Sequence, residues 1–275
     1  MTGANPLVRP DEPLHPVLAD QQSVKIVGLG GIGSIVARYG AMFLASLAKS
    51  QNVRLVLIDG DKFEPQNSSR MFFSDFGNKA AVTRDELLNR FRDSRLTLMA
   101  IEEFVTEENA SRLFHNGDVI IASVDNHATR KLLSDHCARK LDDVVLISGG
   151  NDGMGEDSTG KFRRGTYGNC QIYVRRGGQD MSPSLTQYHP EIANPADRLP
   201  TDQSCTELLS SVPQLLLTNL AAASAILNAL FLCLSGALHY SELAFDIADG
   251  LMRPLPAPAP KLVRPGIPSE PARAG

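Results

Sequence analysis

The stretch Ser23-Val-Lys-Ile-Val-Gly28-Leu-Gly30-Gly31-Ile-Gly33 joins an apolar strand to a glycine-rich turn of the form G-x-G-x-x-G. In this turn the first glycine permits a tight bend, the second lets the backbone approach a phosphate, and the third lets the following helix pack closely on the strand. A helix that begins near Gly31 directs its N-terminal amides and its dipole at an anion. Because dehydrogenases, flavoproteins and methyltransferases share the motif, it predicts a nucleotide site at Gly28, Gly30, Gly31 and Gly33 without naming the nucleotide.

The sequence around this turn alternates between strand and helix patterns from Val24 to about Asn151. This alternation predicts an α/β fold of the Rossmann-like, doubly wound kind, with a mainly parallel sheet and helices on both faces. The strands are expected at 24–28, 53–58, 96–102, 118–124 and 143–149, and the helices at about 31–49, 79–93, 106–115 and 127–140.

The pattern changes in the second half of the chain. Strands are expected at 168–174 and 240–247, and a long apolar helix is expected from about Thr206, kinked or started at Pro213. These elements predict an added antiparallel portion and a long helix in the C-terminal half. The expected organisation is an extended arm at 1–20, one domain at 21–252 that includes a crossover segment at 177–204, and a proline-rich disordered tail at 253–275.

The overall composition argues against several classes of protein. A chain of 275 residues with 43% hydrophobic and 21% charged residues is ordinary for a soluble globular protein. The net charge of −4 gives no electrostatic case for binding nucleic acid. The N-terminus lacks the charged-then-apolar order of a signal peptide, so a cytosolic protein is expected. The apolar run 215–234 is interrupted by Thr218, Asn219, Ser224 and Asn228, which favours a buried core helix over a membrane span.

Four cysteines, Cys137, Cys170, Cys205 and Cys233, lie far apart and form no C-x-x-C pair. That spacing argues against a structural zinc site, so no zinc is expected, and it does not suggest a disulfide framework. Cys205 lies where a polar segment meets the long apolar helix, and a helix N-terminus favours the thiolate form of cysteine. Cys205 is therefore either a reactive thiol or an inert core thiol, whereas the other three lie inside predicted elements and are expected to fill the core.

Polar residues follow the second predicted strand. Asp59 and Asp61 come directly after it. Asn67 and Arg70 follow, and Lys79 stands at the start of the next predicted helix. In Rossmann proteins an acid at the first position binds ribose hydroxyls. A dehydrogenase would need only that acid, and the remaining residues would then be solvated surface charges. In the alternative interpretation, Arg70 and Lys79 neutralise a triphosphate and Asn67 orients one of its oxygens, which predicts ATP.

Asp125 follows the apolar stretch Ile120-Ile-Ala-Ser-Val124 and so emerges at the carboxyl edge of the predicted sheet. Ligands bind at this edge in doubly wound folds. A carboxylate there suits a magnesium ion that bridges phosphates. Asp125 could also cap the helix that begins near Asn126, and the two roles are compatible.

Taken in order, these residues resemble the ubiquitin-activating superfamily, which includes the bacterial ThiF/MoeB-like enzymes that adenylate thiamine and molybdopterin sulfur carriers. The resemblance runs from about Val24 to Ile247. Besides the glycine turn and the polar residues above, it includes Gly77-Asn-Lys79, Asp125-Asn126 with Arg130, and Ser204-Cys205 ahead of the long helix.

The candidate nucleotide-binding residues include Asp61 beside Asp59, and the resemblance assigns specific roles to most of the candidates. Asp59 would hold the ribose, and Asp125 would bind magnesium. Cys205 falls at the position of the family's thioester or persulfide cysteine. The phosphate ligands would be Asn67, Arg70 and Lys79.

Three features of this sequence differ from the family's pattern and limit which branch of the family it can resemble. The spacing from Gly77 to Lys79 is one residue shorter than the family's Gly-x-x-Lys, the paired zinc cysteines of the sulfur-carrier branch are absent, and no second adenylation domain or ubiquitin-fold domain is expected. The segments 194–205 and 245–247 resemble those of compact bacterial members encoded beside ubiquitin-like proteins, conjugating enzymes and JAB-type peptidases. Some of those operons defend against phage.

The function implied by the resemblance is ATP- and magnesium-dependent adenylation of the C-terminal carboxylate of a ubiquitin-like protein. Thioester formation on Cys205 and transfer to a conjugating enzyme would follow. A homodimer is also implied, in which Arg9 in the arm of one protomer reaches the nucleotide of its partner. The alternatives are a sulfur-carrier adenylyltransferase, an NAD(P)-dependent reductase and an ATP-binding scaffold without turnover.

Overall fold

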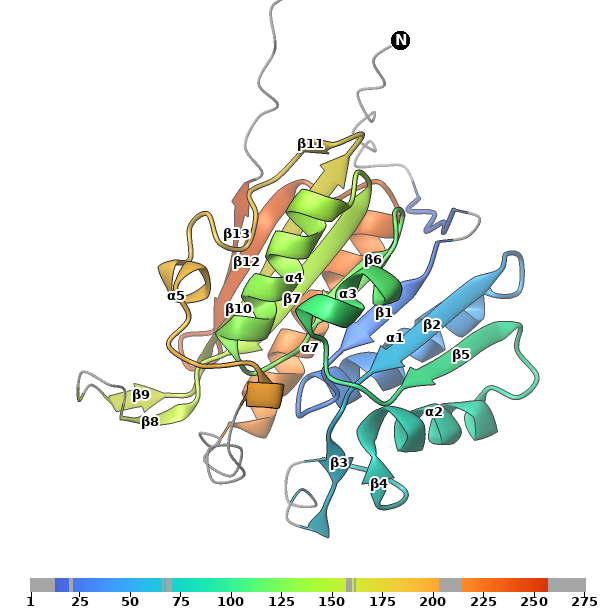
Figure 1. The fold of residues 1–275 in the computed structure, drawn as a ribbon, viewed down its shortest axis with the longest axis horizontal. Coiled ribbons are helices and arrows are strands. Elements are labelled where there is room, and N and C mark those ends of the chain that lie inside the picture. Colours follow the sequence, from blue (N-terminus) through green and yellow to red (C-terminus); the bar gives the residue numbers. More distant parts are fainter. Residues whose placement is uncertain are drawn as a thin grey trace, which may run out of the picture.

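The computed structural model describes residues 13–19, 22–65, 67, 71–156, 160, 162–202 and 214–256 (Figure 1). Within this described part, a nine-stranded sheet has the order β13-β12-β10-β7-β6-β1-β2-β5, with the short β11 paired to β10. The strands are β1 (Val24–Val27), β2 (Val53–Ile58), β5 (Leu96–Ile101), β6 (Val119–Ala122), β7 (Val144–Asn151), β10 (Tyr167–Arg176), β11 (Gln179–Asp180), β12 (Tyr240–Asp246) and β13 (Leu251–Pro256).

The parallel and antiparallel parts of the sheet are separate. Strands β7, β6, β1, β2 and β5 pair in parallel, whereas β10 is antiparallel to both β7 and β12. The prediction of a mainly parallel sheet with an added antiparallel portion is therefore confirmed. The strand order reverses at β1, which has β2 on one side and β6 on the other. Doubly wound folds bind their ligands at the carboxyl ends of strands beside such a switch point.

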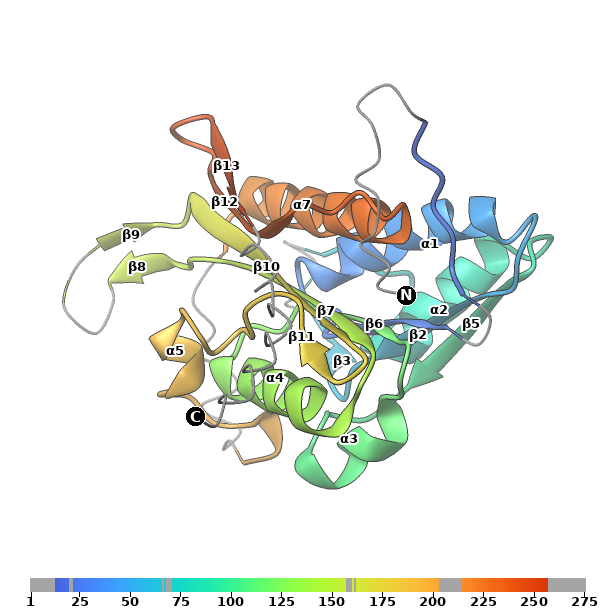
Figure 2. The same ribbon diagram turned by 90° about the horizontal axis from the view of Figure 1, so that it is seen from above.

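Helices cover both faces of the sheet (Figure 2). Each face has its own apolar cluster, because successive side chains of a strand point to opposite sides. Thus Val24 and Ile26 of β1 join the first cluster and Val27 joins the second. One face carries α1 (Gly33–Leu47), α2 (Lys79–Arg90) and α7 (Leu216–Leu234), and the other carries α3 (Glu107–Leu113), α4 (His127–Lys140) and α5 (Pro190–Ala193).

Helix α7 is the one helix of the described residues that is long and apolar enough to cross a membrane on those two criteria. It packs against β7, β10 and α1, which is the arrangement of a core helix. Two of its polar interruptions are buried and bonded to the protein. Thr218 donates from Oγ1 to the carbonyl oxygen of Gly165 at 2.7 Å, and Asn219 accepts from Asn151 Nδ2 at 2.8 Å. The predicted start at Thr206 lies outside the described residues, and α7 begins after Pro213.

Several short elements were missed by the sequence analysis. β3 (Lys62–Phe63) pairs with β4 (Gly77–Asn78), and β8 (Met154–Glu156) pairs with β9 (Phe162–Arg164). Both pairs project from the end of the main sheet at which β2 and β7 finish (Figure 1). Strands of two or three residues carry too little alternation to be detected. A 3₁₀ turn at Pro200–Asp202 closes the described part of the crossover segment.

The first residues of the expected proline-rich tail belong to the main sheet. Strand β13 extends through Pro256 and pairs with β12. Proline is tolerated on an edge strand because one side of that strand makes no ladder hydrogen bonds. The remainder of the predicted tail, 257–275, lies outside the described residues, as does most of the predicted arm.

Candidate functional site

The glycine turn has the geometry that its motif predicts. Gly28 has a φ of +85°, which favours glycine. A Cβ on Gly33 would lie 1.8 Å from the carbonyl oxygen of Gly28, so this position admits no side chain. A Cβ on Gly30 would meet none of the described residues within 4 Å, which leaves space over the turn in this part of the structure. Gly31 differs, because its Cβ would lie 2.4 Å from Nδ2 of Asn219 on α7. Gly31 therefore serves the packing of α7 against the turn.

Helix α1 begins at this turn without a side-chain cap. Its N-cap residue is Ile32, and its first turn contains no acidic residue. The amides of Ser34 and Ile35 donate to the carbonyl oxygens of Gly30 and Ile32. The helix dipole and the amides of the turn just before Ser34 would therefore attract an anion. The turn and the amino end of α1 therefore form a cradle suited to phosphate.

Asp59 stands at the carboxyl end of β2 and is tied to the glycine turn. Its Oδ2 accepts a hydrogen bond from the amide of Leu29 at 2.6 Å, and its Oδ1 accepts one from the amide of Asp61 at 2.8 Å. Burial raises the pKa of the Asp59 carboxyl, whereas the charge of Lys79 and these two backbone hydrogen bonds lower it. Each carboxylate oxygen keeps further acceptor capacity, so ribose hydroxyls can donate to it.

Lys79 joins the same site from the first position of α2. It is buried, with 7% of its surface exposed, and its ammonium forms an ion pair with the Asp61 carboxylate. The preceding residue, Asn78, fixes it in place. Asn78 donates from Nδ2 to the carbonyl oxygen of Asp59 at 2.8 Å and accepts from the amides of Ala80 and Ala81. The cap of α2 thus couples the end of β2 to the lysine.

Asn67 is buried on the loop between β3 and β4. Its Oδ1 accepts a hydrogen bond from the amide of Glu64 at 2.9 Å, and the Met71 amide donates to its carbonyl oxygen at 3.0 Å. These contacts tie Asn67 to described residues on both sides of it in the chain. Arg70, the other predicted phosphate ligand of this loop, lies outside the described residues.

Asp125 follows β6 and is exposed at the carboxyl edge of the sheet. The cap of α4 is Asn126, whose Oδ1 accepts from the Thr129 amide at 2.7 Å. The alternative capping role therefore falls on the neighbouring residue, and the Asp125 carboxylate stays available for a cation.

A residue of the crossover segment also caps α4. Asp197 accepts hydrogen bonds from the amides of His127 and Ala128 at 2.7 and 2.8 Å. This contact fastens the crossover segment beside Asp125. Sequence analysis could not assign it, because Asp197 lies far along the chain from the helix that it caps.

Arg130 stabilises the turn at Asp125 through hydrogen bonds to the backbone. It is buried, and its guanidinium donates to the carbonyl oxygens of Val124 at 3.0 Å and Gly149 at 3.3 Å. Burial lowers the pKa of Arg130, and the charges of Asp125 and Asp197 raise it. A Cβ on Gly150 would lie 2.2 Å from Nη2 of Arg130, so that glycine makes room for the buried cation.

The crossover segment is held to the sheet at a second point by His189. Its Nε2 lies 3.2 Å from Glu242 Oε2 on β12, and its Nδ1 lies 3.0 Å from Glu191 Oε1. The hydrogen bond with Glu242 raises the pKa of His189, although partial burial opposes the shift.

The predicted nucleophile, Cys205, and the arm residue Arg9 both lie outside the described residues. Burial raises the pKa of the Cys137 and Cys170 thiols to about 12 and that of Cys233 to about 11. These three thiols are poor nucleophiles near neutral pH, because the thiolate is the reactive form.

The site therefore combines a glycine cradle, a buried acid, a buried lysine and an exposed carboxylate along one edge of the sheet. A model of the ThiF family matches residues 17–248. The chain belongs to the ThiF family. The resemblance inferred from the sequence is confirmed at this level.

Relatives of this ThiF-family chain match about half of it. It is 28% identical over 132 residues to tRNA threonylcarbamoyladenosine dehydratase from Haemophilus influenzae, which covers 47% of this chain and 48% of that protein. It is 32% identical over 130 residues to adenylyltransferase and sulfurtransferase MOCS3 from Dictyostelium discoideum, covering 46% of this chain and 28% of that protein. The matched region thus spans half or less of each relative's length.

Solved structures share the fold over most of the chain. The structure of E. coli MccB with ATP superposes with a TM-score of 0.58 at 18% identity, covering 88% of this chain and 65% of that one. The structure of PaaA gives a TM-score of 0.57 at 17% identity, covering 86% and 64%. These similarities confirm the fold of the ThiF-family chain.

Proposed function

We propose that this ThiF-family chain adenylates the C-terminal carboxylate of a ubiquitin-like protein with ATP and magnesium. The observation that carries the proposal is the shared edge at which three neighbouring strands end. β1 leads into the glycine cradle, β2 ends in Asp59 beside Lys79, and β6 leads to the exposed Asp125. A dinucleotide-dependent reductase needs the glycine cradle and Asp59, but it gives no role to Asp125 and none to Lys79 beyond its ion pair with Asp61.

The residues present fit a magnesium-bound triphosphate. The described residues leave room above Gly30 for a phosphate, and the Lys79 ammonium, paired with Asp61, supplies a positive charge near Asp59. We assign the ribose to Asp59 and the phosphate oxygens to Asn67, Arg70 and Lys79. Asp125 supplies the hard oxygen ligand that magnesium prefers. When bound there, magnesium would neutralise charge on the phosphates and polarise their oxygens.

The proposed chemistry begins with the carrier's carboxylate. One carboxylate oxygen forms a bond to the α-phosphorus of ATP, the bond from that phosphorus to the bridging oxygen of the β-phosphate breaks, and pyrophosphate leaves. A carboxylate is already ionised near neutral pH, so this step requires no general base. Positioning and neutralisation of the phosphate charge by Arg70 and Lys79 supply most of the acceleration.

We assign the second step to Cys205. Its thiolate would attack the acyl carbon of the adenylate, form a thioester and release AMP, and a conjugating enzyme would then accept the acyl group. The raised pKa values of Cys137, Cys170 and Cys233 support this choice. We place the enzyme in the cytosol, among compact bacterial members of ubiquitin-like conjugation pathways, some of which act in antiviral defence.

A sulfur-carrier adenylyltransferase is the second candidate. Several relatives are named adenylyltransferase and sulfurtransferase, and the adenylation step is common to both proposals. The two differ at Cys205, which would carry a persulfide in the sulfur pathway.

The first test is ATP–pyrophosphate exchange. The purified chain should catalyse exchange that requires magnesium and a small ubiquitin-like protein ending in a free carboxylate. The same carrier with an amidated C-terminus is the matched control and should give no exchange, because an amide nitrogen cannot replace the attacking oxygen. Exchange with the amidated carrier, or binding of NADH without binding of ATP, would contradict the proposal.

We also propose a homodimer. Nine of the 19 residues of α7 are buried, but its amino end exposes Leu216, Leu217 and Leu220, with 49%, 67% and 42% of their surfaces accessible. Burying these leucines against a second copy would stabilise association by the hydrophobic effect. Light scattering should give twice the mass of 29.7 kDa, and Leu217→Glu should shift the protein toward the monomer. A wild-type monomer at micromolar concentration with full exchange activity would refute the dimer.

A further inference from the structure

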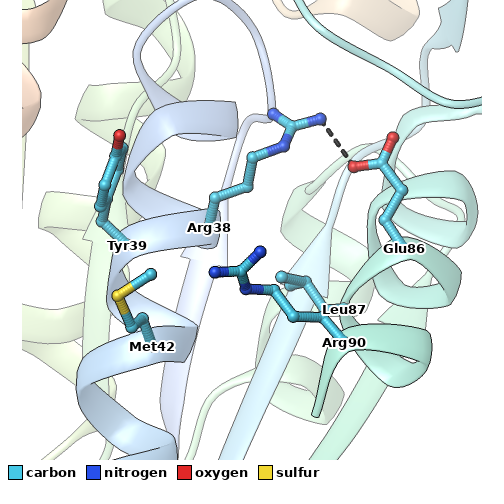
Figure 3. Close-up of a pocket in the computed structure, with 6 residues that line it drawn as sticks. All are labelled: Arg38, Tyr39, Met42, Glu86, Leu87 and Arg90. Carbon is cyan, nitrogen blue, oxygen red and sulfur yellow. Dashed lines mark hydrogen bonds and ion pairs between the residues drawn. The ribbon is translucent and has the colours of Figure 1, made fainter.

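The ion pair between α1 and α2 that Figure 3 shows also contacts the loop that carries part of the proposed phosphate site. Arg38 on α1 and Glu86 on α2 point toward each other, with Nη2 and Oε2 2.7 Å apart. Their side chains are 26% and 18% exposed, so the pair is partly shielded from water. Such shielding strengthens a charge pair relative to one on the open surface.

Both members of the pair also bond to the backbone between β3 and β4. Arg38 donates from Nη2 to the carbonyl oxygen of Phe72. Glu86 accepts from the amide of Ser74 at its other carboxylate oxygen, Oε1. Arg38 is itself oriented by a bond from Nη1 to the carbonyl oxygen of Ser34, in the first turn of α1, at 3.2 Å. One side-chain pair therefore holds a loop, a helix that begins at the glycine cradle and a helix that begins at Lys79.

The clamped stretch lies between the proposed phosphate ligands. On its amino side, the Met71 amide donates to the carbonyl oxygen of Asn67 at 3.0 Å. On its carboxyl side, Asn78 caps α2 and Lys79 follows. A shift of Phe72 or Ser74 would therefore displace Asn67 and Lys79 relative to the cradle.

We propose that Arg38 and Glu86 are positioning residues that set the loop between β3 and β4 against the glycine cradle. The inference rests on the proposed function, because it assumes that the loop and the cradle face one nucleotide. Neither residue touches that nucleotide. The pair fixes the distance between the anion-binding end of α1 and the lysine at the start of α2.

The aromatic contacts of the loop anchor it to β3, so the ion pair is what connects the loop to α1. Phe73 stacks on Phe63 at a centroid distance of 4.7 Å and packs near Phe76, which anchors the loop to β3. On the α1 side, the two helices share buried core residues such as Ala41 and Leu87, but a pocket of about 390 Å³ opens between their outer faces. It is lined by Arg38, Tyr39, Met42, Glu86, Leu87 and Arg90 (Figure 3). The polar clamp therefore supplies the connection to α1.

The test measures loop order and nucleotide affinity separately in the full chain. In Arg38→Met and Glu86→Ala, hydrogen exchange of the peptide containing Ser74 should accelerate about tenfold or more, because a charge-assisted hydrogen bond is lost. The affinity for Mg–ATP should fall about tenfold in each variant. The double variant should be no worse than either single one, because both side chains act on the same loop.

Two variants separate positioning from general destabilisation. Arg112→Met removes an exposed ion pair with Glu103 and should leave both measurements unchanged. Glu86→Gln keeps an oxygen that can accept from Ser74 while losing the charge, so it should retain more loop protection than Glu86→Ala.

The outcomes are distinct. Unchanged exchange at Ser74 in Arg38→Met and Glu86→Ala would overturn the clamp. Accelerated exchange with unaltered Mg–ATP affinity would overturn its positioning role. If the wild-type chain binds no Mg–ATP, the proposed function fails, whereas the hydrogen-exchange measurement still decides whether the clamp orders the loop.

Discussion

Replacing Asp125 with alanine should reduce carrier-dependent ATP–pyrophosphate exchange by about a hundredfold or more. The carboxylate is exposed at the edge of the sheet, and the capping of α4 belongs to Asn126 and Asp197. Its removal should therefore leave the helix intact while the phosphates lose their metal-bound charge. Loss of one preorganised electrostatic contact of this kind costs about 10²- to 10³-fold in rate.

The measurement is exchange at saturating carrier over a range of magnesium concentrations. Asp135→Ala, which removes a carboxylate further along α4 that pairs with Lys131, is the matched control and should exchange normally. Near-normal exchange by Asp125→Ala, with unchanged magnesium dependence, would remove Asp125 from the metal site. A large drop in the thermal unfolding temperature would assign it a structural role instead.

Cys205→Ala should lose every covalent carrier adduct and keep its pyrophosphate exchange. Adenylate formation is complete before a thiol is needed, so the two activities separate at this residue. The adduct of the wild-type enzyme should form with ATP, magnesium and carrier, and it should disappear on addition of a reducing thiol, because thiols attack thioesters and leave amides intact. Non-reducing gels measure it directly.

Cys137→Ala, Cys170→Ala and Cys233→Ala are the controls, and they should retain the adduct. Their side chains are largely withdrawn from solvent, so some loss of stability is expected. A thiol-sensitive adduct that survives in Cys205→Ala would place the chemistry on another cysteine. A wild-type enzyme that exchanges pyrophosphate but forms no adduct would favour direct transfer from the adenylate, and a persulfide on Cys205 would favour the sulfur-carrier alternative.

The sequence predicts the parallel core closely because its strands and helices have strong periodic patterns. The helix expected at 127–140 is α4, and the strand expected at 53–58 is β2. The site residues at the strand ends are equally predictable from the sequence, since Asp59 and Asp125 each follow an apolar run. A parallel sheet brings such positions to a common edge, so chain order alone indicates their proximity.

Other features depend on contacts that no local pattern encodes. Asp197 caps a helix that begins 70 residues earlier in the chain, and Arg130 is buried only because Gly150 has no side chain to displace it. The Arg38–Glu86 pair joins two helices across a loop, and either residue alone has the pattern of a solvated surface charge. Asn78 is an exception that could have been found, because asparagine directly before a predicted helix is an N-cap signal.

The two helices that begin beside the switch point, α1 and α4, differ at their amino ends. Because of this difference, the two parts of the binding edge interact differently with an anion. The leading amides of α4 are taken by the oxygens of Asn126 and Asp197, so an incoming anion meets a saturated and negatively charged helix end. α1 begins at Ile32 with no side-chain cap and no acid in its first turn. The uncapped amino end of α1 is therefore the better direct site for a phosphate. Beside α4, where Asp197 adds negative charge, a phosphate would depend on the cation that we propose at Asp125.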